Sequence, residues 1–331
     1  MLTALDPGRL GNSHIDAHGS FTRSFVDPHH YHSEIRGGDS LLSFLGRGTF
    51  RGEVTTILAG QVTLQRAREN LPRLSCSSMP PHKVGILGWL ADSPLPIVRG
   101  TQMERGDWMC LGEGMQSHHR TSGPVDCVVL TLDAGDLARA AFALTGRDLI
   151  VTATKILRPP AGLGTRLVSA IEAVLHISEI LPDAFTSPRA AHALEATLLR
   201  LMVMCLVHGE IRQESSPQHR RAAIATRFAA AVEANLDGPL LIPDVCRDIG
   251  VPERTLRNLC QEQLGMSPHQ FLALRRLHLV RQILLRSDSH SATVTDIITS
   301  HGIWELGRFA GSYKALFGES PSATRLRQRT T

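Results

Sequence analysis

The spacing of hydrophobic residues changes along the chain, from strand-like runs in the first half to helix-like runs in the second. Between residues 53 and 133, the runs EVTTILAGQVTLQRA, HKVGILGWL and VDCVVLTLD place Val, Ile and Thr at short spacing, with Gly and Pro between the runs. This pattern is typical of strands in a sandwich or barrel. The segment that follows, LDAGDLARAAFALTG, predicts a helix with Asp133 as its N-cap.

Helical periodicity begins after the Pro159–Pro160 pair. Residues 165–181 and 187–209 carry broad apolar faces, and prolines separate them, which predicts a pair of helices. The stretch 210–221 is polar and contains a proline, so it is the best candidate for a linker. Everything beyond it has the pattern of helices joined by short turns.

These patterns predict an α+β protein made of three parts. We expect a β-rich domain over residues 21–160, a helical connecting region over 161–215 and an all-helical domain over 222–328. Residues 1 to about 20 lack a basic segment followed by an apolar one, so we interpret them as a disordered end and not as a signal peptide. No stretch reaches about 18 uncharged apolar residues, so we expect no membrane span.

The last third of the chain contains an internal repeat. Gly265 recurs 53 positions later as Gly318, and Gly250 recurs 52 positions later as Gly302. Each copy fits a helix-turn-helix unit, with an apolar helix, a glycine where a left-handed turn costs least, and a second apolar helix. Two copies are too few for a solenoid or a propeller.

The second helix of the first copy separates apolar from polar side chains. Four polar residues share the face opposite its leucines: Arg254, Arg257, Asn258 and Gln261. Arg and Asn are the side chains that read guanine and adenine edges in a major groove. Between the copies, residues 271–287 contain no Gly or Pro and predict one helix of roughly 16 residues, or about 24 Å. Such a rod is suited to hold two recognition helices in successive major grooves, about 34 Å apart.

The plain alternative is that the copies are two helix pairs that merely pack on each other. A single copy would leave the two interpretations about equally good. However, the segment 218–331 has 15 Lys and Arg against 10 Asp and Glu, so it carries more than the whole excess charge of +4. Two copies in register inside the basic segment therefore favour a polyanion as partner.

Residues 222–327 resemble the DNA-binding domain of AraC/XylS-type transcription regulators. The resemblance rests on the first repeat, on MSPHQFLALRRLHLVRQIL, and on HGIWELGRFAGSYKALFGESPSATRLR. The last stretch contains, in order, a G-[FI] turn, a helix with the pattern F-x-x-x-[FY]-K, and the pattern G-x-S-P. It implies two recognition helices, at about 252–263 and 305–316, with Arg254, Arg257 and Asn258 facing bases.

The second recognition helix departs from the family's pattern. Leu306, Gly307, Ala310 and Gly311 stand where family members often carry polar or Arg residues. We therefore expect this helix to contact the DNA backbone more than the bases. Further candidate DNA-binding residues lie near it: Trp304, Arg308 and Lys314.

The resemblance also implies partners and a location. It implies a jelly-roll-like N-terminal sensor domain that binds a small organic effector, sometimes an aromatic acid, and a helical region that forms a homodimer. Double-stranded promoter DNA and RNA polymerase are the implied macromolecular partners, and the implied location is the cytoplasm. The six scattered cysteines agree with reduced thiols in that compartment.

Several histidines raise a second hypothesis, a metal-dependent jelly-roll enzyme with a DNA-binding tail. His29, His30 and His32 with Glu34 form an H-x-H pattern, and His118 and His119 offer further ligands. We favour solvated loop histidines, because the spacing is loose. The chain has no nucleophile elbow, Walker loop or dinucleotide-binding motif, so we expect no enzymatic activity, no cofactor and no metal.

The remaining singled-out residues have plain interpretations. Arg99, Trp108 and Arg120 are candidates for an effector pocket, but we favour ordinary core or surface roles. Cys246 and Cys260 fall at interior positions of the first repeat and are interpreted as small buried side chains. A third hypothesis, an architectural or oligomerisation protein, rests on the long apolar helices and predicts no preference among DNA sequences.

Overall fold

The computed structural model of the protein describes residues 18–35, 40–90, 92–112, 116–212, 216–235, 240–286 and 292–327. The end that we expected to be disordered is partly ordered, because residues 18–20 open the first strand. The rest of that expectation, residues 1–17, lies outside the described residues.

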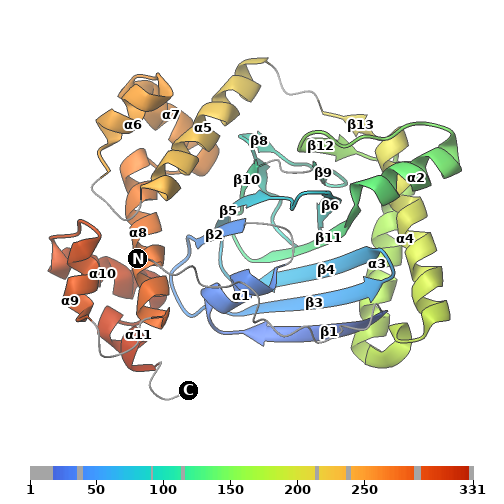
Figure 1. Cartoon of the computed structure of the whole chain (residues 1–331), viewed down its shortest axis with the longest axis horizontal. Helices are drawn as coiled ribbons and strands as arrows, with labels where there is room; N and C mark the ends of the chain where they lie inside the picture. Colours follow the sequence, from blue (N-terminus) through green and yellow to red (C-terminus); the bar gives the residue numbers. More distant parts are fainter. Residues whose placement is uncertain are drawn as a thin grey trace, which may run out of the picture.

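The N-terminal part is built from two antiparallel sheets (Figure 1). An eight-stranded sheet has the order β1-β3-β4-β11-β6-β9-β12-β13, and a five-stranded sheet has the order β2-β5-β10-β7-β8. The strands are β1 (His18–Phe25), β2 (Ser40–Phe44), β3 (Gly52–Ala59), β4 (Val62–Glu69), β5 (Arg73–Ser78), β6 (Lys83–Trp89), β7 (Ile97–Val98), β8 (Thr101–Gln102), β9 (Trp108–Leu111), β10 (Gln116–Arg120), β11 (Val125–Asp133), β12 (Lys155–Arg158) and β13 (Glu210–Ile211).

The helices follow the predicted order, except that the helix at residues 28–34 lies where we expected loop histidines. They are α1 (Pro28–Glu34), α2 (Ala134–Thr145), α3 (Ala161–Ile180), the short 3-10 helix η1 (Pro182–Phe185), α4 (Pro188–His208), α5 (Ser216–Ala234), α6 (Ile242–Ile249), α7 (Glu253–Leu264), α8 (Pro268–Arg286), α9 (Val294–Ser300), α10 (Leu306–Phe317) and α11 (Pro321–Arg327). The fold is therefore α+β, as predicted. Asp133 caps α2 as expected, since its side chain accepts a hydrogen bond from the backbone N–H of Gly135.

One predicted boundary is wrong. Residues 216–221 belong to α5 and do not form part of a linker. Proline is well tolerated in the first turn of a helix, where its missing N–H has no partner to lose, so Pro217 begins the helix here instead of interrupting it.

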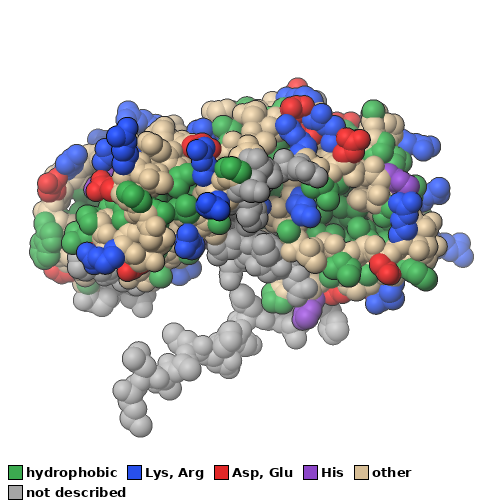
Figure 2. Space-filling model, turned by 90° about the horizontal axis from the view of Figure 1, so that it is seen from above, with side chains coloured by type: hydrophobic (Ala, Val, Ile, Leu, Met, Phe, Trp, Pro, Cys, Tyr) green, Lys and Arg blue, Asp and Glu red, His purple; other side chains and the backbone are tan. Residues whose placement is uncertain are grey.

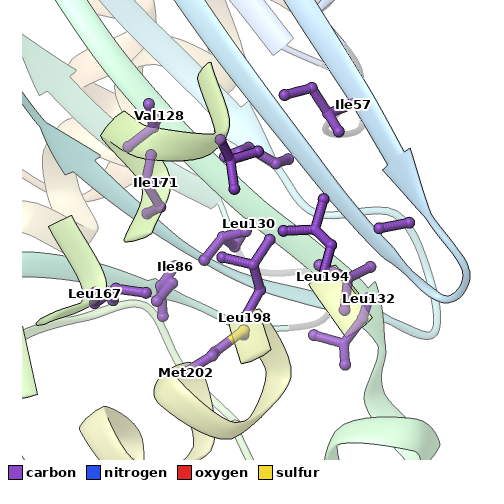
Figure 3. Close-up of a cluster of buried hydrophobic side chains, with 14 of the residues drawn as sticks. Ile57, Ile86, Val128, Leu130, Leu132, Leu167, Ile171, Leu194, Leu198 and Met202 are labelled. Atoms are coloured by element: carbon purple, nitrogen blue, oxygen red, sulfur yellow. The ribbon is translucent and has the colours of Figure 1, made fainter. Parts of the chain in front are cut away.

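One apolar core lies between the two sheets, and a second lies between the larger sheet and the helices α2, α3 and α4. Leu42 and Phe44 of β2 meet Val54, Leu87 and Met109 of the larger sheet between the two layers. On the other face of the larger sheet, α2, α3 and α4 pack against β3, β6 and β11. Figure 3 shows side chains of this second core, which include Ile57, Ile86, Val128, Leu130, Leu132, Leu167, Ile171, Leu194, Leu198 and Met202.

Helix α4 is long and apolar enough to cross a membrane, by length and composition alone. Its residues Leu194, Leu198 and Met202 are buried in the second core against the larger sheet. Packing therefore accounts for the apolar side of α4. No membrane span needs to be invoked for it.

The C-terminal helices cover the outer face of the smaller sheet. They occupy the left of Figure 1, with α8 running beside β2. Leu74 of β5 lies in the same buried cluster as Phe228 of α5, Leu256 of α7 and Phe271 of α8. The two parts of the molecule therefore share a continuous hydrophobic contact.

Candidate nucleic-acid interface

The first repeat folds as a helix-turn-helix unit made of α6 and α7. Val245 and Ile249 of α6 pack against Leu256 and Leu259 of α7 in one buried cluster. Gly250 ends α6 with a φ of 71°, in the left-handed region where a side chain would be strained. The turn thus depends on the glycine that the sequence pattern singled out.

The second repeat folds in the same way from α9 and α10. Ile297 and Ile298 of α9 pack against Phe309 and Tyr313 of α10, and Gly302 occupies the turn with a φ of 71°. Thr293 begins α9 with a capping box, in which its hydroxyl and the carboxylate of Asp296 each satisfy a backbone N–H of the other residue. Both recognition helices start one residue later than predicted.

Helix α8 joins the two units as one uninterrupted element. It has 19 residues, which corresponds to about 28 Å. Its first half carries Phe271 into the core of the first unit, and its second half carries Val280 and Leu284 into the core of the second. The rigid spacer expected from the sequence is therefore present, and it is part of both units.

The predicted reading face of α7 is exposed. Arg254, Arg257, Asn258 and Gln261 are all solvent-exposed, whereas the leucines on the opposite face are buried. Arg257 donates a hydrogen bond to Glu253 at 3.1 Å, and the Gln261 amide donates to the carbonyl of Gly265 at 3.3 Å. Exposed contacts of this kind contribute little to stability, so both side chains are easily redirected to a ligand.

The corresponding face of α10 is smooth and nearly free of side chains. Gly307 and Gly311 are exposed, and a Cβ atom on either would meet nothing within 4 Å. Leu306 and Ala310 are half-buried. This face therefore allows a close approach of another backbone but offers no polar side chain for base recognition.

Polar and aromatic side chains surround that smooth face. Trp304 is 78 % exposed in the turn before α10, Arg308 is exposed and donates to Glu305 at 3.2 Å, and Lys314 is exposed. Figure 2 shows Lys and Arg side chains spread over the surface of the C-terminal half, on its left, with hydrophobic side chains between them. Such a surface suits a polyanion with apolar groups at its edges.

A hollow of about 460 Å³ lies between α8 and the start of α10. Leu277, Ile303 and Phe309 form its apolar wall, and Arg276 and Arg308 lie at its margin. Burial lowers the pKa of Arg276. The sequence did not single out Arg276, because it occupies an ordinary position in the periodic pattern of the spacer helix.

Three side chains of α8 fix the spacer to the N-terminal part. Arg275 donates to Glu233 of α5 at 2.8 Å and to the Ser43 hydroxyl of β2 at 3.0 Å. His278 lies 3.4 Å from the carbonyl of Phe44. Burial, with Arg275 nearby, lowers the pKa of His278 to about 3, so its imidazole is neutral near neutral pH.

Arg281 is the third of these side chains. It donates to Asp27, in the segment before α1, at 2.9 Å and to Glu319, after α10, at 2.8 Å. The spacer is thereby connected both to the β-domain and to the second helix-turn-helix unit. Nothing in the local sequence pattern predicted this role.

The first recognition helix also touches the β-domain. Gly265, which ends α7 with a φ of 75°, lies directly against the guanidinium of Arg120 on β10. Arg120 therefore lies at the domain junction. Of the other two candidates for an effector pocket, Trp108 is 3 % exposed in the second core, and Arg99 donates to the carbonyl of Thr154 at 3.2 Å.

The candidate metal ligands do not converge among the residues that the structure describes. His118 lies 2.8 Å from the Cys76 sulfur and 3.3 Å from the Thr226 hydroxyl of α5, whereas His119 lies 3.4 Å from Arg73 inside the sandwich. Burial lowers the pKa of His118 to about 4. The side chain of His29 lies outside the described residues, and His30 is exposed. In the described ranges no group of three or more His, Cys, Asp or Glu residues is placed to hold a metal ion.

The cysteines behave as expected from their positions. Cys246 and Cys260 are buried in the first helix-turn-helix unit, and all six thiols are free. Burial raises the pKa of the Cys260 thiol to about 12. A protonated, enclosed thiol of this kind is unreactive.

Two helix-turn-helix units on one spacer helix define the class of this molecule, a double helix-turn-helix protein. Residues 245–327 match the family described as helix-turn-helix domain. The chain is 29% identical over 160 residues to the "Probable thc operon regulatory protein" of Rhodococcus erythropolis, and 31% identical over 102 residues to the "XylDLEGF operon transcriptional activator" of Pseudomonas putida. The C-terminal helix-turn-helix domain of the chain is therefore of the AraC/XylS type, as its motifs predicted.

The matches cover only part of each relative. The chain spans about half of the Rhodococcus protein, 48% of each chain, and the Pseudomonas match covers 31% of this chain and 32% of that one. Among solved structures, the AraC-like transcriptional activator CuxR is 14% identical, with a TM-score of 0.43 over 85% of this chain and 99% of that chain. A probable AraC family regulator from Rhodopseudomonas palustris is 32% identical, with a TM-score of 0.30 over 32% of this chain and 97% of that chain.

Proposed function

We propose that the protein is a sequence-specific DNA-binding transcription regulator that places α7 and α10 in successive major grooves of one duplex. The observation that carries this proposal is the continuity of α8, which contributes to the cores of both units. A shared spacer of about 28 Å fixes the separation of the recognition helices near one helical turn of DNA, about 34 Å. Transcription regulation by the two curated relatives supports the same function.

The two helix-turn-helix units make different kinds of contact with DNA. Arg254, Arg257 and Asn258 on α7 read base edges, because they are exposed, polar and on one helix face. Helix α10 contributes mainly contacts to the phosphate backbone, through its bare glycine face and through Arg308 and Lys314. Sequence preference should therefore be concentrated in the half of the DNA site that α7 contacts.

The N-terminal domain controls DNA binding in response to a small organic molecule. This part of the proposal rests on its contact with both functional elements, α7 at Gly265 and α8 at Arg275 and Arg281. A ligand that shifts the β-domain changes the position of these helices. A homodimer, recruitment of RNA polymerase and a cytoplasmic location complete the proposed function, as in the family.

Selection of bound fragments from a random duplex library tests the DNA-binding proposal without knowledge of the target. The full chain should enrich one motif about one and a half helical turns long. On the selected sequence, Arg257→Ala and Asn258→Ala should each weaken binding by about 1–3 kcal/mol and relax the preference at the contacted base pair. Arg200→Ala, an exposed residue on α4, is the matched control and should leave binding unchanged.

Three outcomes would contradict the proposal. The library could yield no enriched motif, which would favour an architectural role. Both α7 variants could retain full affinity and preference, which would exclude this reading face. Stoichiometric iron or zinc in the purified protein, lost on changing His30, would instead favour the metal-dependent enzyme.

A further inference from the structure

One arginine of the spacer helix occupies a central position between the two helix-turn-helix units. Figure 1 shows α8 running from the first unit, at the upper left, to the second unit below it. Arg276 lies close to the midpoint of α8 (Pro268–Arg286). Its side chain therefore starts from a point about equally far from both ends of the spacer.

The side of α8 that carries Arg276 is not the side that contacts the β-domain. Arg275 donates to Ser43 of β2, and His278 lies against the carbonyl of Phe44. Successive residues of a helix are about 100° apart, so Arg276 projects well away from the direction shared by Arg275 and His278. It lines the hollow of about 460 Å³ between α8 and the start of α10.

Two residues that we expect to contact DNA line the same hollow, Trp304 and Arg308. Trp304 is 78 % exposed, and Arg308 is exposed as well. Beneath them, Leu277 of α8 and Phe309 of α10 are buried in the core of the second unit, which fixes the two helices to each other. Arg276 therefore shares one surface with the candidate DNA contacts of α10.

The geometry of B-DNA decides which part of a duplex lies opposite the middle of the spacer. Recognition helices in successive major grooves on one face are about 34 Å apart, and a minor groove crosses that face between them. The middle of α8 is thus opposite a minor groove. Arg275 and Arg281 are directed to the β-domain by their hydrogen bonds, whereas Arg276 lies on the surface that carries Trp304 and Arg308.

The chemistry of Arg276 suits a narrow minor groove. Stretches of A·T base pairs have such a groove, and its strong negative potential attracts arginine. A G·C pair adds the guanine amino group, a hydrogen-bond donor, to the same groove. Arg276 is half-buried, and burial lowers its pKa because the cation is incompletely hydrated. A guanidinium is also more weakly hydrated than an ammonium group, so it is the cation that is most readily transferred into a groove.

We propose that Arg276 is a third DNA-contacting element, which lies in the minor groove between the two half-sites and selects A·T base pairs there. This inference rests on the proposed function, because it requires α7 and α10 to occupy successive major grooves. It adds a preference at the centre of the site, at base pairs that neither recognition helix contacts.

Three duplexes test this preference. Each carries the sequence selected by the full chain, with A·T, G·C or inosine·cytosine pairs midway between the two halves. Inosine·cytosine has the major-groove edge of G·C but lacks the amino group in the minor groove. The unaltered chain should bind the A·T and inosine·cytosine centres alike, and the G·C centre about tenfold more weakly. Fluorescence anisotropy titrations measure the three Kd values.

Two variants assign the preference to one side chain. Arg276→Ala should bind all three duplexes alike, and the slope of log Kd against log salt concentration should fall by about one. Arg276→Lys should keep that slope but lose most of the preference, because an ammonium group is more strongly hydrated. Arg200→Ala, at an exposed position on α4, is the matched control and should change neither quantity.

The proposal is overturned if the unaltered chain binds the three centres equally, or if Arg276→Ala retains the preference. It is also overturned if the inosine·cytosine centre binds as weakly as the G·C centre, since the preference would then arise in the major groove. The comparison on the unaltered chain stands even if a variant fails to fold. Binding to the selected motif without a preference at its centre would refute this inference alone. The absence of any preferred sequence would refute the proposed function and this inference with it.

Discussion

The ion pair between Asp27 and Arg281 gives a quantitative test of how the two parts of the protein are joined. The two side chains are separated by 254 positions in the sequence, yet the guanidinium donates to the carboxylate at 2.9 Å. Each residue is only 6% exposed. The pair is therefore largely desolvated, and its loss should be measurable in the free energy of unfolding.

The two single changes should have unequal effects. Arg281→Met removes the guanidinium that donates to the buried carboxylate of Asp27, which should cost about 3–5 kcal/mol. Asp27→Asn leaves Arg281 with its second partner, Glu319, and should cost only about 1–3 kcal/mol. With both changes present, no buried charge remains unpaired between these two positions. The double variant should therefore be about 2 kcal/mol more stable than the sum of the single effects predicts.

Urea unfolding of the four proteins, followed by tryptophan fluorescence and by circular dichroism, measures this coupling. Trp108 reports on the β-domain core, whereas the helical signal includes the C-terminal units. If the two parts unfold together, the two signals should give the same midpoint. Additivity within about 0.5 kcal/mol would refute the reasoning, because it would mean that the two side chains do not interact in solution.

Two further predictions concern stability. Gly250→Ala should lower the free energy of unfolding by about 1 kcal/mol, because Gly250 has a φ of 71°. Gly307 is exposed inside α10, and an added Cβ would meet nothing within 4 Å. Gly307→Ala should therefore raise the free energy of unfolding by up to about 1 kcal/mol. Urea midpoints that move in the same direction for both would contradict the assigned backbone. His118 has a folded pKa of about 4, below its unfolded value of about 6.5, so its neutral form stabilises the protein fully above pH 6.5, and this stability is lost as the pH falls toward 4. His118→Gln should reduce the slope of unfolding free energy against pH in that window by up to about 1.4 kcal/mol per unit, and an unchanged slope would show that the imidazole is not buried.

Local patterns predicted the elements of this fold well. The left-handed glycines, the apolar faces of α6, α7, α9 and α10, and the uninterrupted spacer all follow from interactions between residues close in sequence. The short spacing of Val, Ile and Thr in the strand runs likewise predicted the strands of a sandwich or barrel. Such features repeat along the chain, so they are visible without any knowledge of tertiary contacts.

The docking of the two parts could not be predicted in this way. Arg275 and Arg281 sit among the apolar residues of the spacer as ordinary solvated arginines would, and their partners Ser43 and Asp27 lie more than two hundred positions away. Pairing across such distances leaves no periodic trace in one sequence.

The histidines illustrate a second limit. His118 and His119 were candidate metal ligands that we expected to be solvated loop residues. They are instead buried on β10, and neighbouring residues of a strand point to opposite faces. His118 therefore meets α5, and His119 meets Arg73 inside the sandwich.

The central claim is that one rigid spacer holds two recognition helices on the same side of a duplex. Hydroxyl-radical footprinting of the full chain on the selected site measures this arrangement directly. The DNA backbone should be protected in two patches on one face of the duplex, separated by one helical turn, about 34 Å. A single protected patch, or two patches on opposite faces, would contradict the account.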